Sequence, residues 1–335
     1  MITVPSSSRV LLIAPQFFGY EHEIAAGLNR SGYEVDLLPD RPFTNPLMKA
    51  VMRFRPELGG HRSCDQFFSR RLEELGRSNY STILVIQGEG VTSNTLMKIR
   101  KAYPRARLVF YTWDSLENKP FSRKNLSMYD HCSTFDPVDA KKYGMYFRPL
   151  FYTDGFDRPA DTAYAYDLSF IGTVHSDRYR IVHALLKQLP TDTRTFVYLY
   201  LQAPWMYDLR NIFTNTVDGA KRDEFRFEPL SKDVVQATFF RSRAVLDIEH
   251  VNQRGATMRT MEALGSKRKM VTTNVTLRDY DFYNPLNIQI IDRKAPRMDL
   301  EFLRSPYQAL PEEIRQKYSI RQWIREVCGM SNLDQ

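Results

Sequence analysis

The stretch DLSFIGTVHSDR, residues 167–178, predicts a buried strand, a sharp turn and the start of a helix. Its first half is largely apolar, as a strand inside a sheet requires. Gly172 lets the backbone turn sharply, and Ser176 or Asp177 can cap the helix that follows. A strand that leads into a helix in this way is the repeating unit of a parallel sheet covered on both faces.

The same alternation runs through both halves of the chain. In the first half we expect strands at 9–14, 33–38, 82–86, 107–112, 132–135 and 145–148, helices at 20–30 and 93–102, and a largely helical stretch at 49–75 that is broken near Pro56 and Gly59-Gly60. In the second half we expect strands at 167–172, 195–200, 225–227, 244–248 and 269–273, and helices at 178–188, 204–213, 233–241, 256–264 and 320–327. The prediction is an α/β protein with two Rossmann-like, doubly wound sheets of about five parallel strands each.

Residues 151–165 are turn-rich and polar, which is typical of a linker. We therefore predict one domain at 1–150, a linker at 151–165, a second domain at 166–319 and a terminal segment at 320–335. The chain has 335 residues, too many for one ordinary core, and its 43% of apolar residues can fill two.

The chain carries a net charge of +8 and has a pI of about 9.3, which favours anionic partners such as nucleotides, nucleic acid or an anionic lipid surface. Its three cysteines, Cys64, Cys132 and Cys328, are far apart and lack CxxC spacing. They are typical of reduced thiols in a cytosolic protein. No apolar run approaches the roughly 20 residues of a membrane span, and no signal peptide is recognised, so we expect a cytoplasmic protein.

The most informative polar pattern is QRGATMRTMEALG, residues 253–265, after the strand expected at 244–248. A loop containing Gly255 leads into the helix expected from Ala256, so free N–H groups and the positive end of the helix dipole would face an anion. Arg259 and Glu262 lie three residues apart, on one face of the helix. The guanidinium suits phosphate and the carboxylate suits ribose hydroxyls. An ordinary surface ion pair is the alternative.

A second pattern follows the strand at 167–172. Thr173, His175, Ser176 and Arg178 offer hydrogen-bond donors at the carboxyl end of the sheet, where open α/β folds bind ligands. A plain capped turn with a solvated His175 is the alternative.

In the first half, Asp114 follows the strand at 107–112 and stands beside Trp113. A carboxylate shielded by an indole ring could act as a general base with a raised pKa, and the alternative is a turn cap. Gly19, Tyr20 and Glu21 follow the first strand, where Gly19 permits a substrate to approach closely.

No metal site is predicted. His22 and Glu23 are adjacent and point apart on a helix, and Asp279-Tyr280-Asp281 is interpreted as a loop despite its DxD pattern. A basic stretch with interleaved phenylalanines suggests a solvated helix face or a surface for lipid headgroups. It comprises Lys49, Arg53, Arg55, Arg62, Arg70, Arg71, Phe54, Phe67 and Phe68.

Residues 247–265, followed by KMVTTN at 269–274, resemble the donor-site core of GT-B glycosyltransferases. WDS at 113–115, FIGTVHSDR at 170–178 and YDFYN at 280–284 resemble signatures of the spore-maturation-like and the lipopolysaccharide or capsule biosynthesis transferases. The resemblance spans most of the chain. It implies two domains with a cleft between them, a nucleotide-sugar donor in the second domain, an acceptor in the first, and a final helix that returns to the first domain.

By this resemblance Glu262 holds the ribose of the donor. The full predicted donor set is Gly172, Thr173, His175, Ser176, Arg178, Glu249, Gly255, Thr257, Arg259 and Glu262, with Gly19, Tyr20 and Glu21 on the acceptor side. Retaining members often have a second glutamate at the position of Arg254, and this departure favours an inverting enzyme with Asp114 or His250 as the base. We expect no obligatory metal, no nucleic-acid partner and a glycan or lipid-linked acceptor in surface polysaccharide synthesis. Peripheral contact with the inner face of a membrane is a further expectation. A nucleotide-sugar epimerase and a non-catalytic nucleotide- or glycan-binding protein are the alternatives.

Overall fold

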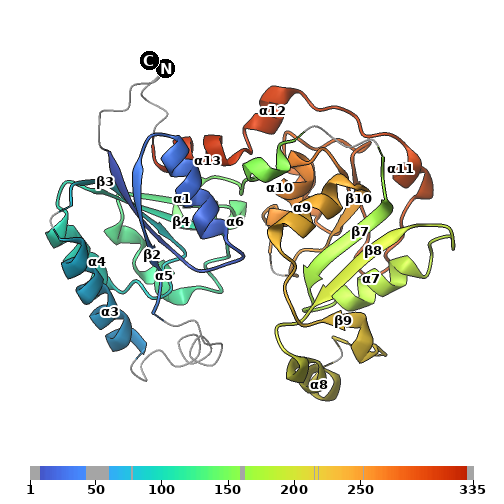
Figure 1. Ribbon diagram of the computed structural model, residues 1–335, viewed down its shortest axis with the longest axis horizontal. Coiled ribbons are helices and arrows are strands. Elements are labelled where there is room, and N and C mark those ends of the chain that lie inside the picture. Colours follow the sequence, from blue (N-terminus) through green and yellow to red (C-terminus); the bar gives the residue numbers. More distant parts are fainter. Residues whose placement is uncertain are drawn as a thin grey trace. The chain divides into compact units, whose positions relative to one another are not determined.

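The computed structural model describes residues 8–42, 60–76, 78–158, 163–214, 216–217, 219–251 and 253–329. They fall into two compact units (Figure 1). Unit 1 takes its residues from Met1–Pro149 and Ile320–Gln335, and unit 2 from Leu150–Ser319.

Unit 1 is built on a parallel sheet with six strands in its described residues, in the order β2-β1-β3-β4-β5-β6. The strands are β1 (Arg9–Ala14), β2 (Glu34–Pro39), β3 (Tyr80–Ile86), β4 (Arg107–Thr112), β5 (His131–Thr134) and β6 (Tyr146–Phe147). In β1 every residue from Val10 to Ala14 is buried, because helices cover both faces of a doubly wound sheet. Its Ile13 pairs with Leu38 on one side and Val85 on the other, which fixes β1 inside the sheet.

The helices of unit 1 pack in pairs. They are α1 (Tyr20–Arg30), α3 (Gly60–Leu75), α4 (Ser93–Ala102), α5 (Pro120–Lys124), α6 (Pro137–Tyr143) and α13 (Ile320–Val327). The α3 helix lies along α4, and α1 lies along α13 (Figure 1). A Cβ at Gly27 of α1 would stand 2.6 Å from Cδ1 of Ile324 in α13. The glycine therefore permits this close packing of the C-terminal helix on unit 1.

Unit 2 repeats the architecture with a parallel sheet that also has six strands in its described residues, in the order β12-β11-β10-β7-β8-β9. The strands are β7 (Tyr166–Thr173), β8 (Thr195–Tyr200), β9 (Phe225–Arg226), β10 (Ser242–Asp247), β11 (Lys269–Thr272) and β12 (Ile288–Ile290). The helices are α7 (Arg178–Leu186), α8 (Pro204–Phe213), α9 (Lys232–Phe240), α10 (Met258–Gly265), α11 (Leu300–Arg304) and α12 (Glu312–Gln316).

The predicted fold class, two doubly wound parallel-sheet units, is confirmed. The estimate of about five strands in each sheet is one too low in both, although the six ranges expected in the first half correspond to β1–β6. In unit 2 the missed strand is Ile288–Ile290, which is too short to show a period. In the predicted linker, 151–165, the described residues belong to unit 2. Phe151, Tyr152 and Phe156 are buried there, since aromatic side chains in a turn-rich stretch still gain from burial.

In each sheet the chain reverses its direction of progress beside the first strand. In unit 1 the reversal lies between β1 and β3, and in unit 2 between β7 and β10. Open α/β sheets bind ligands outside the carboxyl ends of the strands at such a switch point. Functional side chains are therefore expected in the loops that follow these four strands.

Candidate functional site

The loop after β7 is tied to the loop after β10 by the side chain of Arg178. Its Nη1 donates a hydrogen bond of 2.9 Å to the carbonyl of Thr173, and its Nε one of 2.7 Å to the carbonyl of Ile248. A Cβ at Gly172 would lie 3.4 Å from Nη1 and 2.9 Å from Cζ of Phe170, so the glycine makes room for the guanidinium. Burial lowers the pKa of Arg178 to about 10, which leaves it cationic at neutral pH.

This geometry gives Arg178 a structural task that the sequence did not reveal. Within the described residues its Nη2 donates no hydrogen bond, so one face of the guanidinium remains available to an anion. The predicted contact with phosphate is thus compatible with the geometry, although two of the three nitrogens already hold main-chain carbonyls.

His175 and His250 bring two imidazole rings together at this switch point. Their ring centres are 5.2 Å apart, and Nδ1 of His175 lies 3.0 Å from the hydroxyl of Ser176. Burial, together with the charges of Arg178 and neighbouring cationic side chains, lowers the pKa of His175 to about 3. His175 is therefore neutral at physiological pH. Ser176 has a φ of 47°, an unusual value for a residue other than glycine, and strained backbone of this kind gathers at functional sites.

A buried carboxylate fixes the start of α10. Oδ2 of Asp247, at the end of β10, accepts hydrogen bonds from the hydroxyls of Thr257 at 2.8 Å and Thr260 at 2.6 Å. The two threonines also form a reciprocal capping box at the helix start. Asp247 therefore fixes where the positive end of the α10 dipole lies relative to the sheet.

The N–H groups at this helix end are divided between internal bonds and open positions. The amide of Ala256 donates to the hydroxyl of Tyr280 at 3.0 Å, and that of Thr257 to the Thr260 hydroxyl at 3.1 Å. In the part of the chain that the structure describes, the amides of Met258 and Arg259 donate no hydrogen bond. Two amides at the positive end of a helix dipole are therefore available to an anion.

Arg259 and Glu262 form the ion pair expected from their spacing, with Nη1 and Oε2 2.7 Å apart. The pair is not an ordinary surface bridge, because the Glu262 side chain is only 6% exposed. The Arg259 guanidinium also lies 5.0 Å from the ring centre of Phe239. The carboxylate oxygens of such a pair can also accept hydrogen bonds from hydroxyl groups of a ligand.

The sequence analysis missed Arg293, which is the most connected cation of this region. It bonds to both carboxylate oxygens of Asp177, at 2.9 and 2.8 Å, and its Nη1 lies 2.5 Å from Oε1 of Glu249. The other oxygen of Glu249 accepts a hydrogen bond from the Thr273 hydroxyl. Burial raises the pKa of Glu249, whereas in Asp177 the bonds from Arg293 outweigh the effect of burial and lower the pKa.

Glu249 therefore helps to hold these loops together through Arg293 and Thr273, and its role in binding the donor stays a prediction. The loop that contains Gly255 is held in a similar way. The carbonyl of this buried glycine accepts a 3.1 Å hydrogen bond from the Asn274 side chain, which comes from the turn after β11. Asn274 is visible in the sequence as the last residue of KMVTTN, but the sequence does not show that it bonds to Gly255.

In unit 1, Asp114 lies at the carboxyl end of β4, as predicted, and holds the following turn. Oδ1 accepts hydrogen bonds from the amide of Ser115 at 2.9 Å and from the side chain of Asn118 at 3.3 Å. Oδ2 lies 3.4 Å from Nζ of Lys119. These contacts match the turn cap considered as an alternative, and the role of Asp114 as a base stays a prediction.

Asp114 also belongs to a wider network of charges that the sequence did not indicate. Lys119 pairs with Glu89, which in turn pairs with Arg41. Nε of Arg41 lies 3.3 Å from a carboxylate oxygen of the buried Asp40. Burial raises the pKa of Asp40 to about 6, and the pKa of Glu89 is lowered because Lys119 and Arg41 outweigh its burial. The network joins residues that follow β2, β3 and β4.

The loop after β1 has an unusual backbone held by a buried carboxylate. Phe18 and Gly19 have φ values of 50° and 77°, so two successive residues adopt a left-handed conformation. Oε2 of Glu21 accepts a 3.1 Å hydrogen bond from the amide of Phe17. Glu21 is only 6% exposed, so the carboxylate that holds this loop is buried. Tyr20 begins α1 and its ring centre lies 6.4 Å from that of Phe17.

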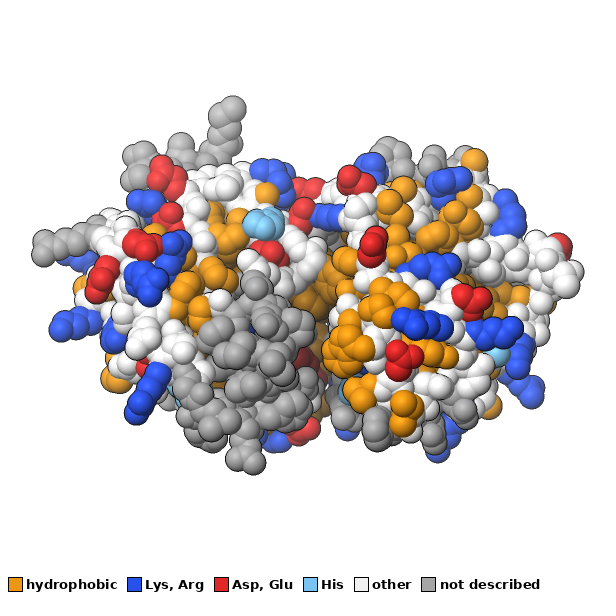
Figure 2. Space-filling view, turned by 60° about the horizontal axis from the view of Figure 1, so that its bottom comes forward, with side chains coloured by type: hydrophobic (Ala, Val, Ile, Leu, Met, Phe, Trp, Pro, Cys, Tyr) orange, Lys and Arg blue, Asp and Glu red, His pale blue; other side chains and the backbone are white. Residues whose placement is uncertain are grey.

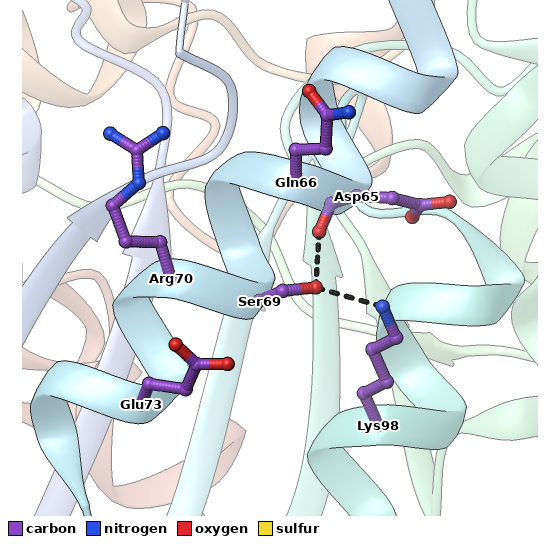
Figure 3. A pocket seen from close by; sticks show the side chains of 6 residues that line it. All are labelled: Asp65, Gln66, Ser69, Arg70, Glu73 and Lys98. Carbon is purple, nitrogen blue, oxygen red and sulfur yellow. Dashed lines mark hydrogen bonds between the residues drawn. The ribbon is translucent and has the colours of Figure 1, made fainter.

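Two other regions contain no comparable arrangement. A shallow hollow of about 320 Å³ between α3 and α4 is lined by Asp65, Gln66, Ser69, Arg70, Glu73 and Lys98 (Figure 3). There Lys98 donates to the Ser69 hydroxyl at 2.8 Å, and this hydroxyl donates to the carbonyl of Asp65 at 2.6 Å. Of the predicted basic stretch, Arg62, Arg70 and Arg71 lie on α3, while Lys49, Arg53, Phe54 and Arg55 lie outside the described residues.

Metal ligands were sought as well. Among the described residues no group of three or more His, Cys, Asp or Glu side chains is arranged to hold a metal ion. In the DxD pattern, Asp281 is held by Lys317 at 2.7 Å and by the hydroxyl of Tyr318 at 2.6 Å. None of the described helices combines the length and apolar composition needed to cross a bilayer.

No family model and no curated protein matches the sequence. Solved structures, however, match nearly the whole chain. The apo structure of OtsA has a TM-score of 0.62 at 13% identity, covering 98% of this chain and 99% of its own. HepE of Anabaena, in complex with UDP and glucose, has a TM-score of 0.56 at 12% identity, covering 96% and 98%. An α-glucosyltransferase in complex with UDP-glucose and DNA containing an abasic site has a TM-score of 0.54 at 12% identity, covering 96% and 95%. The likeness establishes the fold of the chain as the two-domain α/β fold of these proteins.

Proposed function

We propose that this protein is a glycosyltransferase that moves a sugar from a nucleoside diphosphate sugar, bound by unit 2, to a glycan or glycolipid acceptor bound by unit 1. The observation that carries the proposal is the switch point of unit 2. There the two available amides at the start of α10 lie in the same chain segment as the Arg259–Glu262 pair. An amide-lined helix start is a pyrophosphate site, and a buried carboxylate beside it suits a ribose.

The charge distribution of this switch point supports a diphosphate ligand. The positive charges of Arg178, Arg210 and Arg293 help to lower the pKa of His175. Those of Arg259 and Arg293 help to lower the pKa of Arg178. Negative charge grows on the pyrophosphate as the sugar departs, so fixed cations and helix amides stabilise the transition state more than the bound donor. UDP or UDP-glucose in two solved structures of the same fold makes uridine diphosphate sugars the first donors to test.

For the transfer step we propose an inverting displacement without an obligatory metal. Arg254 stands where retaining relatives often have a glutamate, so a side chain must remove the proton of the acceptor hydroxyl. Asp114 is the first candidate, and His250 the second. Lys119 lies 3.4 Å from Asp114 and is held by Glu89 as well, so a small shift of the ammonium would release the carboxylate for proton transfer.

An amphipathic helix supports the proposed peripheral contact of this protein with a membrane. Trp205, Leu209 and Ile212 of α8 are 60%, 47% and 71% exposed and lie on one face of the helix by their spacing. Figure 2 shows apolar side chains with Lys and Arg among them on the face of unit 2 around α8. The whole chain carries a net charge of +8, so a protein with this exposed apolar helix face suits an anionic membrane surface.

The function is tested with a panel of UDP-, GDP- and CMP-sugars, with and without glycan acceptors. Release of nucleotide with a new glycoside supports the proposal, whereas conversion of the donor sugar without an acceptor identifies an epimerase. Binding of nucleotide without turnover of any donor identifies a binding protein. Sedimentation with vesicles containing anionic lipid tests the membrane contact. Ile212→Ser should weaken it, while Val275→Ser, at an exposed valine elsewhere in unit 2, should not.

A further inference from the structure

An aromatic surface lies at the switch point of unit 1, and no part of the donor site uses it. Phe17 and Phe18, in the loop after β1, are 45% and 57% exposed. Their ring centres are 4.8 Å apart in an edge-to-face arrangement. Trp113, in the loop after β4, places its ring centre 6.1 Å from that of Phe17. We call Phe17, Phe18, Tyr20 and Trp113 the aromatic surface.

The backbone under this surface is fixed rather than relaxed. The left-handed φ of Phe18 costs free energy, whereas Gly19 adopts such a φ readily, and the amide of Phe17 is held by the buried carboxylate of Glu21. Leaving the two phenylalanine rings exposed costs further free energy of folding, because water solvates the rings poorly. A fold that holds exposed rings on a strained loop, at the edge where α/β sheets bind ligands, has the features of a binding site.

The surroundings of the rings favour a particular ligand. Asp114 follows Trp113 in the chain and is linked through Lys119 to Glu89, so charged groups come directly after the aromatic surface in the loop that follows β4. Gln16 is exposed, and its side-chain amide makes no hydrogen bond within the described residues. Flat apolar faces next to hydrogen-bonding groups match a pyranose ring, which has C–H groups on its faces and hydroxyls around its rim. The electron-rich face of an aromatic ring attracts the C–H groups, and the polar groups bind the hydroxyls.

A lipid chain fits these observations less well. It would need an extended aliphatic track, but the other large apolar side chains exposed among the described residues of unit 1 lie on different elements. Met97 is on α4, Val138 on α6, and Tyr146 and Phe147 on β6. We infer that the aromatic surface binds a pyranose ring of the acceptor, with a sugar face stacked on the ring of Phe17. This inference rests on the proposed function, since it names the part of the acceptor that unit 1 recognises.

The test uses a binding measurement that needs no nucleotide. Saturation-transfer NMR with methyl glycosides of glucose, galactose, mannose and N-acetylglucosamine reports which ring protons contact the protein. We expect contact for at least one glycoside, and a loss of about three- to tenfold in affinity for Phe17→Leu, as expected for removing one aromatic contact. The leucine keeps an apolar side chain and removes only the ring. Met97→Ala, an equally exposed apolar site on α4, is the matched control and should bind as the wild type does.

The outcomes separate this inference from the proposed function. Glycoside binding that depends on Phe17 supports the inference even if no nucleotide sugar is consumed. If the protein hydrolyses or transfers from a donor but binds no glycoside of the panel, or binds one equally well in Phe17→Leu, the inference is overturned and the proposed function stands. Binding of a dodecyl phosphate probe that is lost in Phe17→Ser but kept in Met97→Ala, without pyranoside binding, would assign the surface to lipid and overturn the inference too. Circular dichroism melting of each variant shows that the fold is retained.

Discussion

Arg293 forms an ion pair with Glu249 across 44 residues of the chain, with Nη1 2.5 Å from Oε1, and at the same time holds Asp177, 116 residues away. The two carboxylates stand in the loops after β7 and β10, on either side of the switch point of unit 2. One guanidinium therefore fixes the distance between the two loops that hold the predicted donor-binding residues.

We expect Arg293→Ala to cost about 3 kcal/mol of unfolding free energy, because it leaves two partly buried carboxylates without their cation. Nucleotide affinity should fall together with stability, since both loops lose their common support. Chemical denaturation and calorimetry measure the two effects. Lys294→Ala, at the exposed neighbouring position, should change neither, and an Arg293→Ala variant of wild-type stability would contradict the clamp.

The regular elements of the site were predictable from the sequence because their signals are local. The strand at 107–112 and the helices at 20–30, 93–102 and 204–213 begin and end where apolar runs, glycines and capping residues place them. Gly172 and Arg178 were recognised for the same reason, since a strand, a turn and a helix start follow one another within twelve residues.

The pairings that complete the site could not be predicted in this way. Arg293 follows β12, whereas Glu249 follows β10 and Asp177 follows β7. They meet because the strand order β12-β11-β10-β7 brings the ends of these strands to one edge of the sheet, and no local pattern determines that order. The same holds for the hydrogen bond that the amide of Ala256 donates to the hydroxyl of Tyr280, 24 residues away. A sequence pattern shows which residue types are present, whereas the partner of a buried charge depends on tertiary structure.

Glu262→Gln tests the predicted ribose contact. The change keeps the size of the side chain but removes the charge that pairs with Arg259. A hydrogen bond to a charged group contributes about 1.5–3 kcal/mol, so we expect nucleotide affinity to fall by about ten- to 150-fold. Isothermal titration with the preferred nucleotide measures the loss. Glu301→Gln, at an exposed glutamate of the same unit, is the control. An unchanged dissociation constant for Glu262→Gln would exclude the ribose contact.

His175 should remain neutral through the physiological range. Its pKa in the folded protein is about 3, below the value of about 6.5 expected in the unfolded chain. The unfolded state therefore takes up the proton first, and stability falls as the pH decreases from 6.5 toward 3. Nitrogen-15 NMR of the imidazoles should show no protonation of His175 between pH 5 and 8. A midpoint near 6.5 would show that the site is open to water.

Asp40 should produce the opposite slope. Its folded pKa of about 6 exceeds the unfolded value of 3.8, so the unfolded chain ionises first and stability falls as the pH rises from 3.8 to 6. Above pH 6 the loss is complete and of the order of 3 kcal/mol. Asp40→Asn should remove this fall. Urea denaturation at pH 4.5 and pH 7.5 compares the variants, and equal pH dependence in both proteins would show that Asp40 ionises normally.

Asp114→Asn tests the candidate base, and the structure makes the result easier to interpret. The asparagine can still accept hydrogen bonds from the amide of Ser115 and the side chain of Asn118, so the turn is retained. It cannot accept a proton from the acceptor hydroxyl. If Asp114 is the base, kcat for transfer should fall by about 10²–10⁴-fold while donor affinity is unchanged. The acidic limb of the pH–rate profile should disappear as well.

The control must separate loss of the base from disturbance of the charge network. Glu89→Gln weakens the hold on Lys119 without touching the carboxylate of Asp114, so it should alter the pH–rate profile while most of kcat is retained. Transfer at nearly the wild-type rate by Asp114→Asn, with the acidic limb unmoved, would leave Asp114 as a turn cap. His250, whose ring lies 5.2 Å from that of the neutral His175, would then be the base to test by His250→Gln.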